Sequence, residues 1–363
     1  MLSHLSRWFW IFASPLVLFL VLWLINHLIY YYFFRHKKLS LEAPTALMAL
    51  SMTSLALWPA VNPHPIIMNL IAMEFLVLWL YLGMKFVSDN IFQTVSAKIK
   101  PDHISIGIWV GATLLPTLLF VEIEPTLYGL IIFFAMTAII LWILYCYFCI
   151  KWLNKWIHKK YALRIDARLL FASINTSFLA LMTYQLLNQE LSFLIYELLL
   201  ILAGFAYGIS LYAMLIQALR FHKHHLLMHL NANITLFYSA IAILGLAVIN
   251  TGMPQAMVEM LWWAMIISLI IIESLAFLKA AFRMKKHGLV TILLFHDQSQ
   301  WLRIFSWAAC YAFFRAYQFP YDAHHVPALI PLTSLMMIML LIFYQLLLLV
   351  FHRNHHSYQL KFK

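Results

Sequence analysis

Long apolar stretches alternate with short polar gaps along this chain, and the pattern predicts a bundle of membrane-spanning helices. About eleven stretches are each roughly 17 to 28 residues long, against the ~20 residues that a helix needs to cross ~30 Å of hydrocarbon. The composition agrees, because 64% of the residues are hydrophobic and only 10% are charged. Such a chain has little material for a soluble domain. We therefore expect an all-α polytopic membrane protein.

Lysine and arginine residues gather in every second gap between the apolar stretches. These gaps include Arg35 to Lys38, Lys98 to Lys100, Lys151 to Arg168 and Lys279 to Lys286, whereas Arg7 precedes the first stretch on the other side. Because cytoplasmic loops carry the excess of basic residues, we expect an external N-terminus and a cytoplasmic C-terminus. This topology and attraction to anionic lipids explain the net charge of +11, so we assign no nucleic-acid partner.

The later apolar stretches fall into five pairs at a near-constant spacing, which indicates a repeated unit of two helices. Their first members begin near Thr45, Ser105, Arg168, Leu226 and Leu302. Ser, Thr, Asn and Gln are enriched in these first members, and polar groups at membrane depth usually face protein or water. We therefore expect the first helices to surround a central pore and the return helices to face lipid. The alternative is that small polar residues only let neighbouring helices approach and hydrogen-bond.

The chain accordingly divides into three parts. Residues 1–43 form an N-terminal anchor helix with a basic linker, residues 44–352 form the ten-helix domain, and residues 353–363 form a cytoplasmic tail. The first stretch, from Trp8 to Phe34, shows no signal-peptide cleavage site and is interpreted as a retained helix.

Candidate pore-lining residues come from the first helix of each pair. Pro59 and Pro116 each remove a backbone hydrogen bond, and the freed backbone groups must be buried or line a water-filled cavity. Arg315 would attract anions at the outer mouth, or would instead form a salt bridge with Asp322 or with the acidic turn near Glu122. The other candidates are polar residues of the inner helices: Thr113, Thr117, Asn175, Thr176, Asn233 and Thr235.

Two local matches add a family resemblance to this arrangement. Ile174 to Leu181 contains an Asn followed by small hydroxyl residues in the fifth helix of the ten, and Phe305-Ser306-Trp307 is an aromatic-Ser-aromatic motif in the ninth. The chain resembles the tellurite-resistance and C4-dicarboxylate transporter family, which includes bacterial homologues of the plant slow anion channels. The resemblance covers residues 44–353.

The resemblance implies passage of small anions, of the chloride, nitrate, sulfite or C4-dicarboxylate class, through a hydroxyl-lined pore. It further implies a bacterial inner-membrane protein, a homotrimer, no cofactor and an aromatic plug at Trp307, with Phe305 as its neighbour. The plug position holds Trp where the family usually has Phe. Glu74 and Glu273 also depart from the family pattern, since they lie inside return helices. They should lie in helix packing, be protonated or couple to protons.

A histidine-rich cytoplasmic side suggests a different class of protein. The spacings H-x-x-x-H (His225, His229) and H-x-x-H-H (His352, His355, His356) occur in membrane di-iron desaturases and hydroxylases, where imidazole suits iron. The short cytoplasmic loops favour the transporter, with no catalytic residue and no metal. The di-iron enzyme and a non-conducting membrane scaffold remain the alternatives.

Overall fold

The computed structural model describes residues 15–34, 44–61, 64–94, 105–123, 127–158, 167–187, 189–220, 232–250, 253–287, 300–318 and 329–359. These residues form eleven α-helices, two short 3-10 turns and no strand, which confirms an all-α fold. The first helices of the five pairs are α3 (Thr45–Val61), α5 (Ile106–Ile123), α7 (Phe171–Leu186), α10 (Leu236–Asn250) and α13 (Gln300–Gln318). The return helices are α4 (Pro65–Thr94), α6 (Tyr128–His158), α8 (Gln189–Arg220), α11 (Gln255–His287) and α14 (Leu329–Gln359). The helix before the pairs is α2 (Pro15–Phe34), and the 3-10 turns η2 (Ala167–Leu170) and η3 (Ala232–Thr235) lead into α7 and α10.

The first helices of the five pairs form a closed inner ring. In this ring α3 packs on α5, α5 on α7, α7 on α10, α10 on α13, and α13 back on α3. Because one return helix separates each inner helix from the next, all five run in the same direction. Burial separates the two sets: 78% of the α5 span is buried against 28% of the α6 span, and 67% of the α7 span against 22% of the α8 span. The expected division into inner and outer helices is confirmed.

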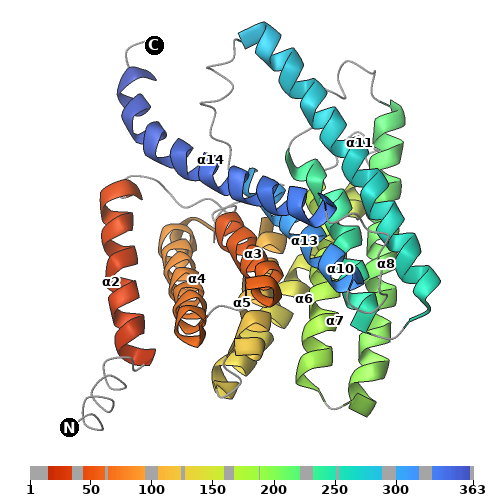
Figure 1. Ribbon diagram of the computed structural model, residues 1–363, viewed down its shortest axis with the longest axis horizontal. Helices are drawn as coiled ribbons and strands as arrows, with labels where there is room; N and C mark the ends of the chain where they lie inside the picture. Colours follow the sequence, from red (N-terminus) through yellow and green to blue (C-terminus); the bar gives the residue numbers. More distant parts are fainter. Residues whose placement is uncertain are drawn as a thin grey trace.

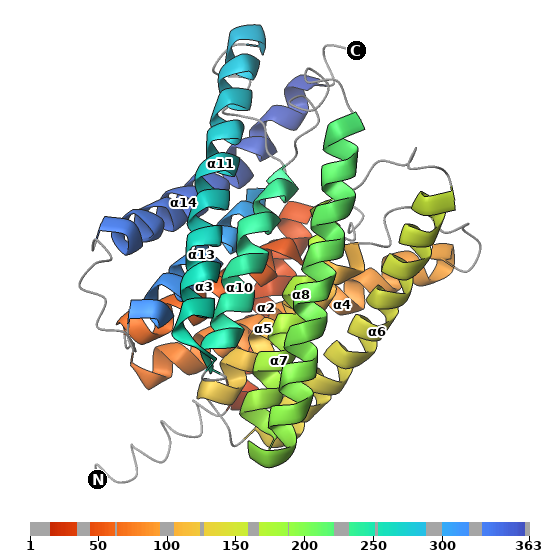
Figure 2. The same ribbon diagram turned by 90° about the vertical axis from the view of Figure 1, so that its right-hand side faces the viewer.

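Four of the outer helices each cover a seam, which is the line along which two neighbouring inner helices meet. Helix α4 packs on α3 and α5, α6 on α5 and α7, α8 on α7 and α10, and α11 on α10 and α13. Helix α14 packs on α13 and lies obliquely across the bundle (Figure 1). Figure 2 shows α6, α8 and α11 along the outside of the ring. The inner helices are thereby shielded from lipid by their own hairpin partners.

A tryptophan-threonine hydrogen bond recurs at two successive seams. Trp79 of α4 donates its indole N–H to the Thr113 hydroxyl of α5 at 2.9 Å, and Trp142 of α6 donates to Thr176 of α7 at 3.0 Å. Both pairs are separated by 34 residues. An outer helix is thus fastened to the next inner helix by the same contact one hairpin later, as expected for a repeated structural unit.

Seven of the described helices are long and apolar enough to cross a membrane individually. The apolar stretches of α2, α3 and α10 are shorter, and α13 belongs to neither group. Helix α13 contains Arg303 and Arg315 yet most of its residues are buried. Since the hairpin partners cover the inner helices, these helices need not be apolar on all sides to lie within a membrane. The structure therefore supports an integral membrane protein.

Helix α2 lies outside the ring and packs along α4 at one edge of the bundle (Figure 1). The Asn26 side-chain amide of α2 donates a 2.8 Å hydrogen bond to the Glu74 carboxylate of α4. Glu74 is therefore a carboxylate in helix packing. At the other end of the chain, α14 continues to Gln359, so the helix extends into residues 353–363, which were assigned to the tail from the sequence.

Candidate functional site

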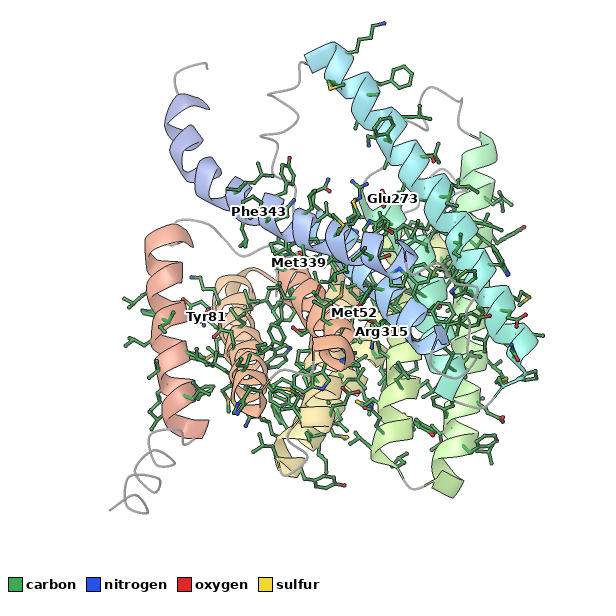
Figure 3. The ribbon with its side chains drawn as sticks, in the orientation of Figure 1. Met52, Tyr81, Glu273, Arg315, Met339 and Phe343 are labelled. Atoms are coloured by element: carbon green, nitrogen blue, oxygen red, sulfur yellow. The ribbon has the colours of Figure 1, made fainter. Side chains whose placement is uncertain are left out.

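A cavity of about 320 Å³ lies at the C-terminal ends of the inner helices. All five inner helices contribute to it, so it lies on the axis of the ring. Its lining residues are Met52, Leu55, Ala56 and Pro59 of α3, Leu118 and Glu122 of α5, Phe178, Leu181 and Gln185 of α7, Leu246 of α10, and Ala312, Arg315 and Ala316 of α13. Figure 3 shows Met52 and Arg315 toward the centre of the bundle, on the same side of α14. The sequence predicts that this end of the ring faces the outside.

The polar lining residues are confined to the rim of the cavity. Glu122, Gln185 and Arg315 all lie within the last few residues of their helices. The Gln185 side chain hydrogen-bonds the Glu122 carboxylate. Arg315 occupies the last turn of α13, where a cation offsets the partial negative charge of a helix C-terminus. Among the described residues, the rim therefore combines one cation, one hydrogen-bonded carboxylate and one amide.

The floor of the cavity is formed by Met52 and Phe178, and both side chains are fully buried. The Phe178 ring packs edge-on against the Phe305 ring, with 6.4 Å between their centroids. Phe305 itself has no exposed surface, nor do Met48 and Ile174 one turn before the floor residues. A water-sized solute therefore cannot pass these side chains in this structure. The axis of the ring is closed by apolar groups.

The two candidate gate residues point in different directions. Phe305 precedes the cavity-lining residues Ala312 and Ala316 by seven and eleven residues, which places all three on one face of α13. Trp307 is two residues further along and points about 200° away. Its ring packs against Tyr238 of α10, with centroids 6.5 Å apart. Contrary to the expectation for a plug at Trp307, Phe305 is the aromatic residue on the cavity-facing side.

The expected hydroxyl lining is directed into the seams. Thr113 and Thr176, which accept the indole hydrogen bonds, each donate to a carbonyl in their own helix, at 2.7 and 2.6 Å. Thr117 likewise donates to the Thr113 carbonyl at 2.7 Å. The Asn175 amide donates to the Gly107 carbonyl of α5 at 2.9 Å. These four residues are buried between helices, so the packing interpretation of the polar residues is the one that the geometry supports.

Some of the remaining candidate residues line the cavity, and the others are buried within the helix packing. Pro59 and Arg315 line the cavity. Pro116 is buried within α5 and does not line it. Thr235 accepts a 3.1 Å hydrogen bond from Ser306 and so contributes to the contact between η3 and α13. Asn233 is buried in η3, one turn before α10.

Glu273 belongs to a polar cluster between α10, α11 and α13. It forms an ion pair with Arg303 and accepts a 2.8 Å hydrogen bond from the Tyr238 hydroxyl. Figure 3 shows Glu273 on the side of α11 that faces the bundle. The carboxylate that the sequence placed alone within a return helix is therefore neutralised by an arginine of the inner ring.

The histidines of the two di-iron spacings have no described side chains. His225 and His229 lie outside the described residues, and for His352, His355 and His356 only the backbone of α14 is described. Within the described residues, no group of three or more His, Cys, Asp or Glu side chains could hold a metal ion.

Sequence reasoning missed the floor residues Met52 and Phe178 and the rim residues Glu122 and Gln185. The available signal was a seven-residue spacing along one helix face, which joins Met52 to Pro59, and Phe178 to Gln185. The expectation of a hydroxyl-lined pore pointed to polar residues, whereas most of the described lining is apolar.

No protein-family model matches the chain, and no curated protein or solved structure is significantly similar to it.

Proposed function

We propose that this protein is a membrane transport protein that passes small anions along the axis of its inner ring, as the family resemblance predicts. The observation that carries the proposal is the cavity to which every inner helix contributes. Protein interiors pack densely and contain few voids larger than a water molecule. A space of about 320 Å³ on the ring axis is therefore more than helix packing requires.

The charges at both ends of the ring support an anion as the solute. Arg315 supplies a cation at the rim of the cavity. The other end of the ring holds the N-termini of all five inner helices, where the helix dipole is positive. Arg168 lies at this end and donates a 2.5 Å hydrogen bond to Ser105 at the start of α5. Positive groups therefore lie at both entrances, and at the cavity rim Arg315 offsets the helix C-termini and Glu122.

Transport through the ring requires the apolar side chains below the cavity to move. A constriction lined by apolar groups excludes water, and an ion without water or polar partners in such surroundings costs many kcal/mol. Met52 is unbranched and can change rotamer easily. The Phe178 and Phe305 rings are the bulkier part of the closure, and we propose that Phe305 is the gate.

Flux measurements in liposomes test this proposal. We expect Phe305→Ala to raise the flux of chloride, nitrate, sulfite or malate above wild type, because the substitution removes a ring below the floor. Trp307→Ala is the matched control: it removes a large aromatic residue from the same helix, but from the face that contacts Tyr238. It should lower stability without raising flux.

Protein-free vesicles set the background in this experiment. Folded Phe305→Ala protein with background flux for all four anions would contradict transport and favour a non-conducting scaffold. Increased flux in Trp307→Ala alone would restore the plug position that the sequence predicted.

A further inference from the structure

We infer that the cavity binds a small organic acid with one carboxylate and a short apolar chain. This inference rests on the proposed function and identifies the class of anion that the ring would receive. It follows from how polar and apolar groups are distributed between the rim and the floor.

The depth of the cavity suits an elongated solute. From the floor residue Phe178 to the rim residue Gln185 the α7 helix advances seven residues, or about 10 Å. The residues between these levels are aliphatic: Leu55, Ala56, Leu118, Leu181, Leu246 and Ala312. A volume of about 320 Å³ is at the lower end of the ~300 to 1,000 Å³ that ligand sites occupy. An alkyl chain of a few carbons would contact these aliphatic side chains, which form the wall of the cavity.

The rim supplies groups that recognise one carboxylate. Arg315 can hold a carboxylate through paired N–H groups, a geometry that guanidinium matches. Glu122 lies on the same rim and would repel a second negative charge. The Gln185 side chain is already engaged by Glu122. The rim therefore favours a monoanion over a dianion.

The aliphatic wall disfavours inorganic anions inside the cavity. Among the described lining residues, none below the rim has a side-chain hydroxyl, amide or charge that could replace the hydration shell of chloride. Apolar methylene groups, in contrast, gain free energy when they leave water for this wall. The carboxylate would lie beside Arg315 and the alkyl chain would point toward Met52 and Phe178.

Calorimetry on the full chain in lipid nanodiscs tests the inference with acetate, butyrate, hexanoate, octanoate and decanoate. Each added methylene should tighten binding by up to about fourfold, equivalent to ~0.8 kcal/mol, until the chain fills the cavity. Beyond that length the affinity should stop rising. Empty nanodiscs measure partition into lipid, for which the affinity rises with every added methylene.

Comparison ligands and variants distinguish the contribution of the ligand's carboxylate to binding from that of its alkyl chain. Succinate and chloride should bind at least tenfold more weakly than hexanoate. Arg315→Gln should weaken the binding of hexanoate about tenfold or more and leave the binding of 1-hexanol unchanged. Ala312→Phe fills the cavity and should remove the dependence on chain length. Gly204→Ala on α8, where nothing lies within 4 Å of the added methyl group, should bind like wild type.

The outcomes are distinct. An affinity that rises without a break, or one that Ala312→Phe does not change, would overturn the inference even if Arg315→Gln fails to fold. Tighter binding of succinate or chloride than of hexanoate would also overturn it. If hexanoate does not bind while Phe305→Ala conducts chloride, the inference fails and the proposed function stands. If hexanoate binds as described but no variant conducts, the cavity is a binding site and the transport proposal fails.

Discussion

The ring axis and the seams around it are built from opposite kinds of residue. Along the axis, Met52, Phe178 and Phe305 close the ring with apolar side chains that have no exposed surface. In the seams, Thr113 and Thr176 accept hydrogen bonds from tryptophans of the outer helices. These two threonines thus connect inner helices to outer helices, and the apolar side chains face the centre. In the proposed function, side-chain size and water exclusion would control solute access, whereas hydrogen bonds contribute to holding the hairpins together.

Breaking the Glu273–Arg303 pair should give the largest loss of stability. The two side chains are 16% and 25% exposed, so removal of one leaves the other charge largely shielded from water. We expect Glu273→Ala to lower the free energy of unfolding by about 3 kcal/mol, measured by denaturation in detergent.

The double variant Glu273→Met with Arg303→Met is the control, because it removes both charges and keeps the volume. It should lose much less stability than Glu273→Ala. Equal losses in the two variants would show that the pair is not the cause.

The inner ring is packed more closely than the outer helices, and this difference predicts a second, smaller effect on stability. A methyl group added at Gly245 of α10 would overlap the Phe313 ring of α13, whereas one added at Gly204 of the outer helix α8 meets nothing within 4 Å. Gly245→Ala should therefore cost about 1 to 3 kcal/mol. Gly204→Ala should stabilise by about 0.5 to 1 kcal/mol, because alanine favours a helix more than glycine. Thermal melting compares the two variants, and an equal shift would contradict the close contact of α10 with α13.

The smallest expected effect concerns the repeated indole hydrogen bonds. Trp79→Phe and Trp142→Phe each remove one donor and keep an aromatic ring, so each should cost about 1 kcal/mol. Because the two bonds lie at different seams, the double variant should lose the sum of the single losses. Anion flux should be unchanged in both single variants. A rise in flux would place the threonines on the solute path and not in the seams.

The fold was largely predictable from the sequence, and the site was not. Apolar length and the alternation of basic gaps predicted the hairpins. The expected helix starts at Thr45 and Ser105 fall within one residue of the starts of α3 and α5, and Arg168 lies in η2, which leads into α7. The direction of each side chain follows only from the three-dimensional packing, because Phe305 and Trp307 are the two aromatic positions of the same motif. Only the neighbours of α13 decide which of them faces the axis. The role of Thr113 depends likewise on Trp79, which lies in another hairpin.

Thiol labelling tests the central claim most directly, namely that the path lies on the axis beside Ala312 and not in the seams beside Thr176. In a background with Cys146, Cys149 and Cys310 replaced, single cysteines would be placed at these two positions in sealed vesicles. A membrane-impermeant thiol reagent applied from outside should react rapidly with Ala312→Cys, which lines the open cavity, and leave Thr176→Cys unmodified. Equal or faster reaction of Thr176→Cys would show a hydroxyl-lined path and contradict the arrangement of polar seams around an apolar axis.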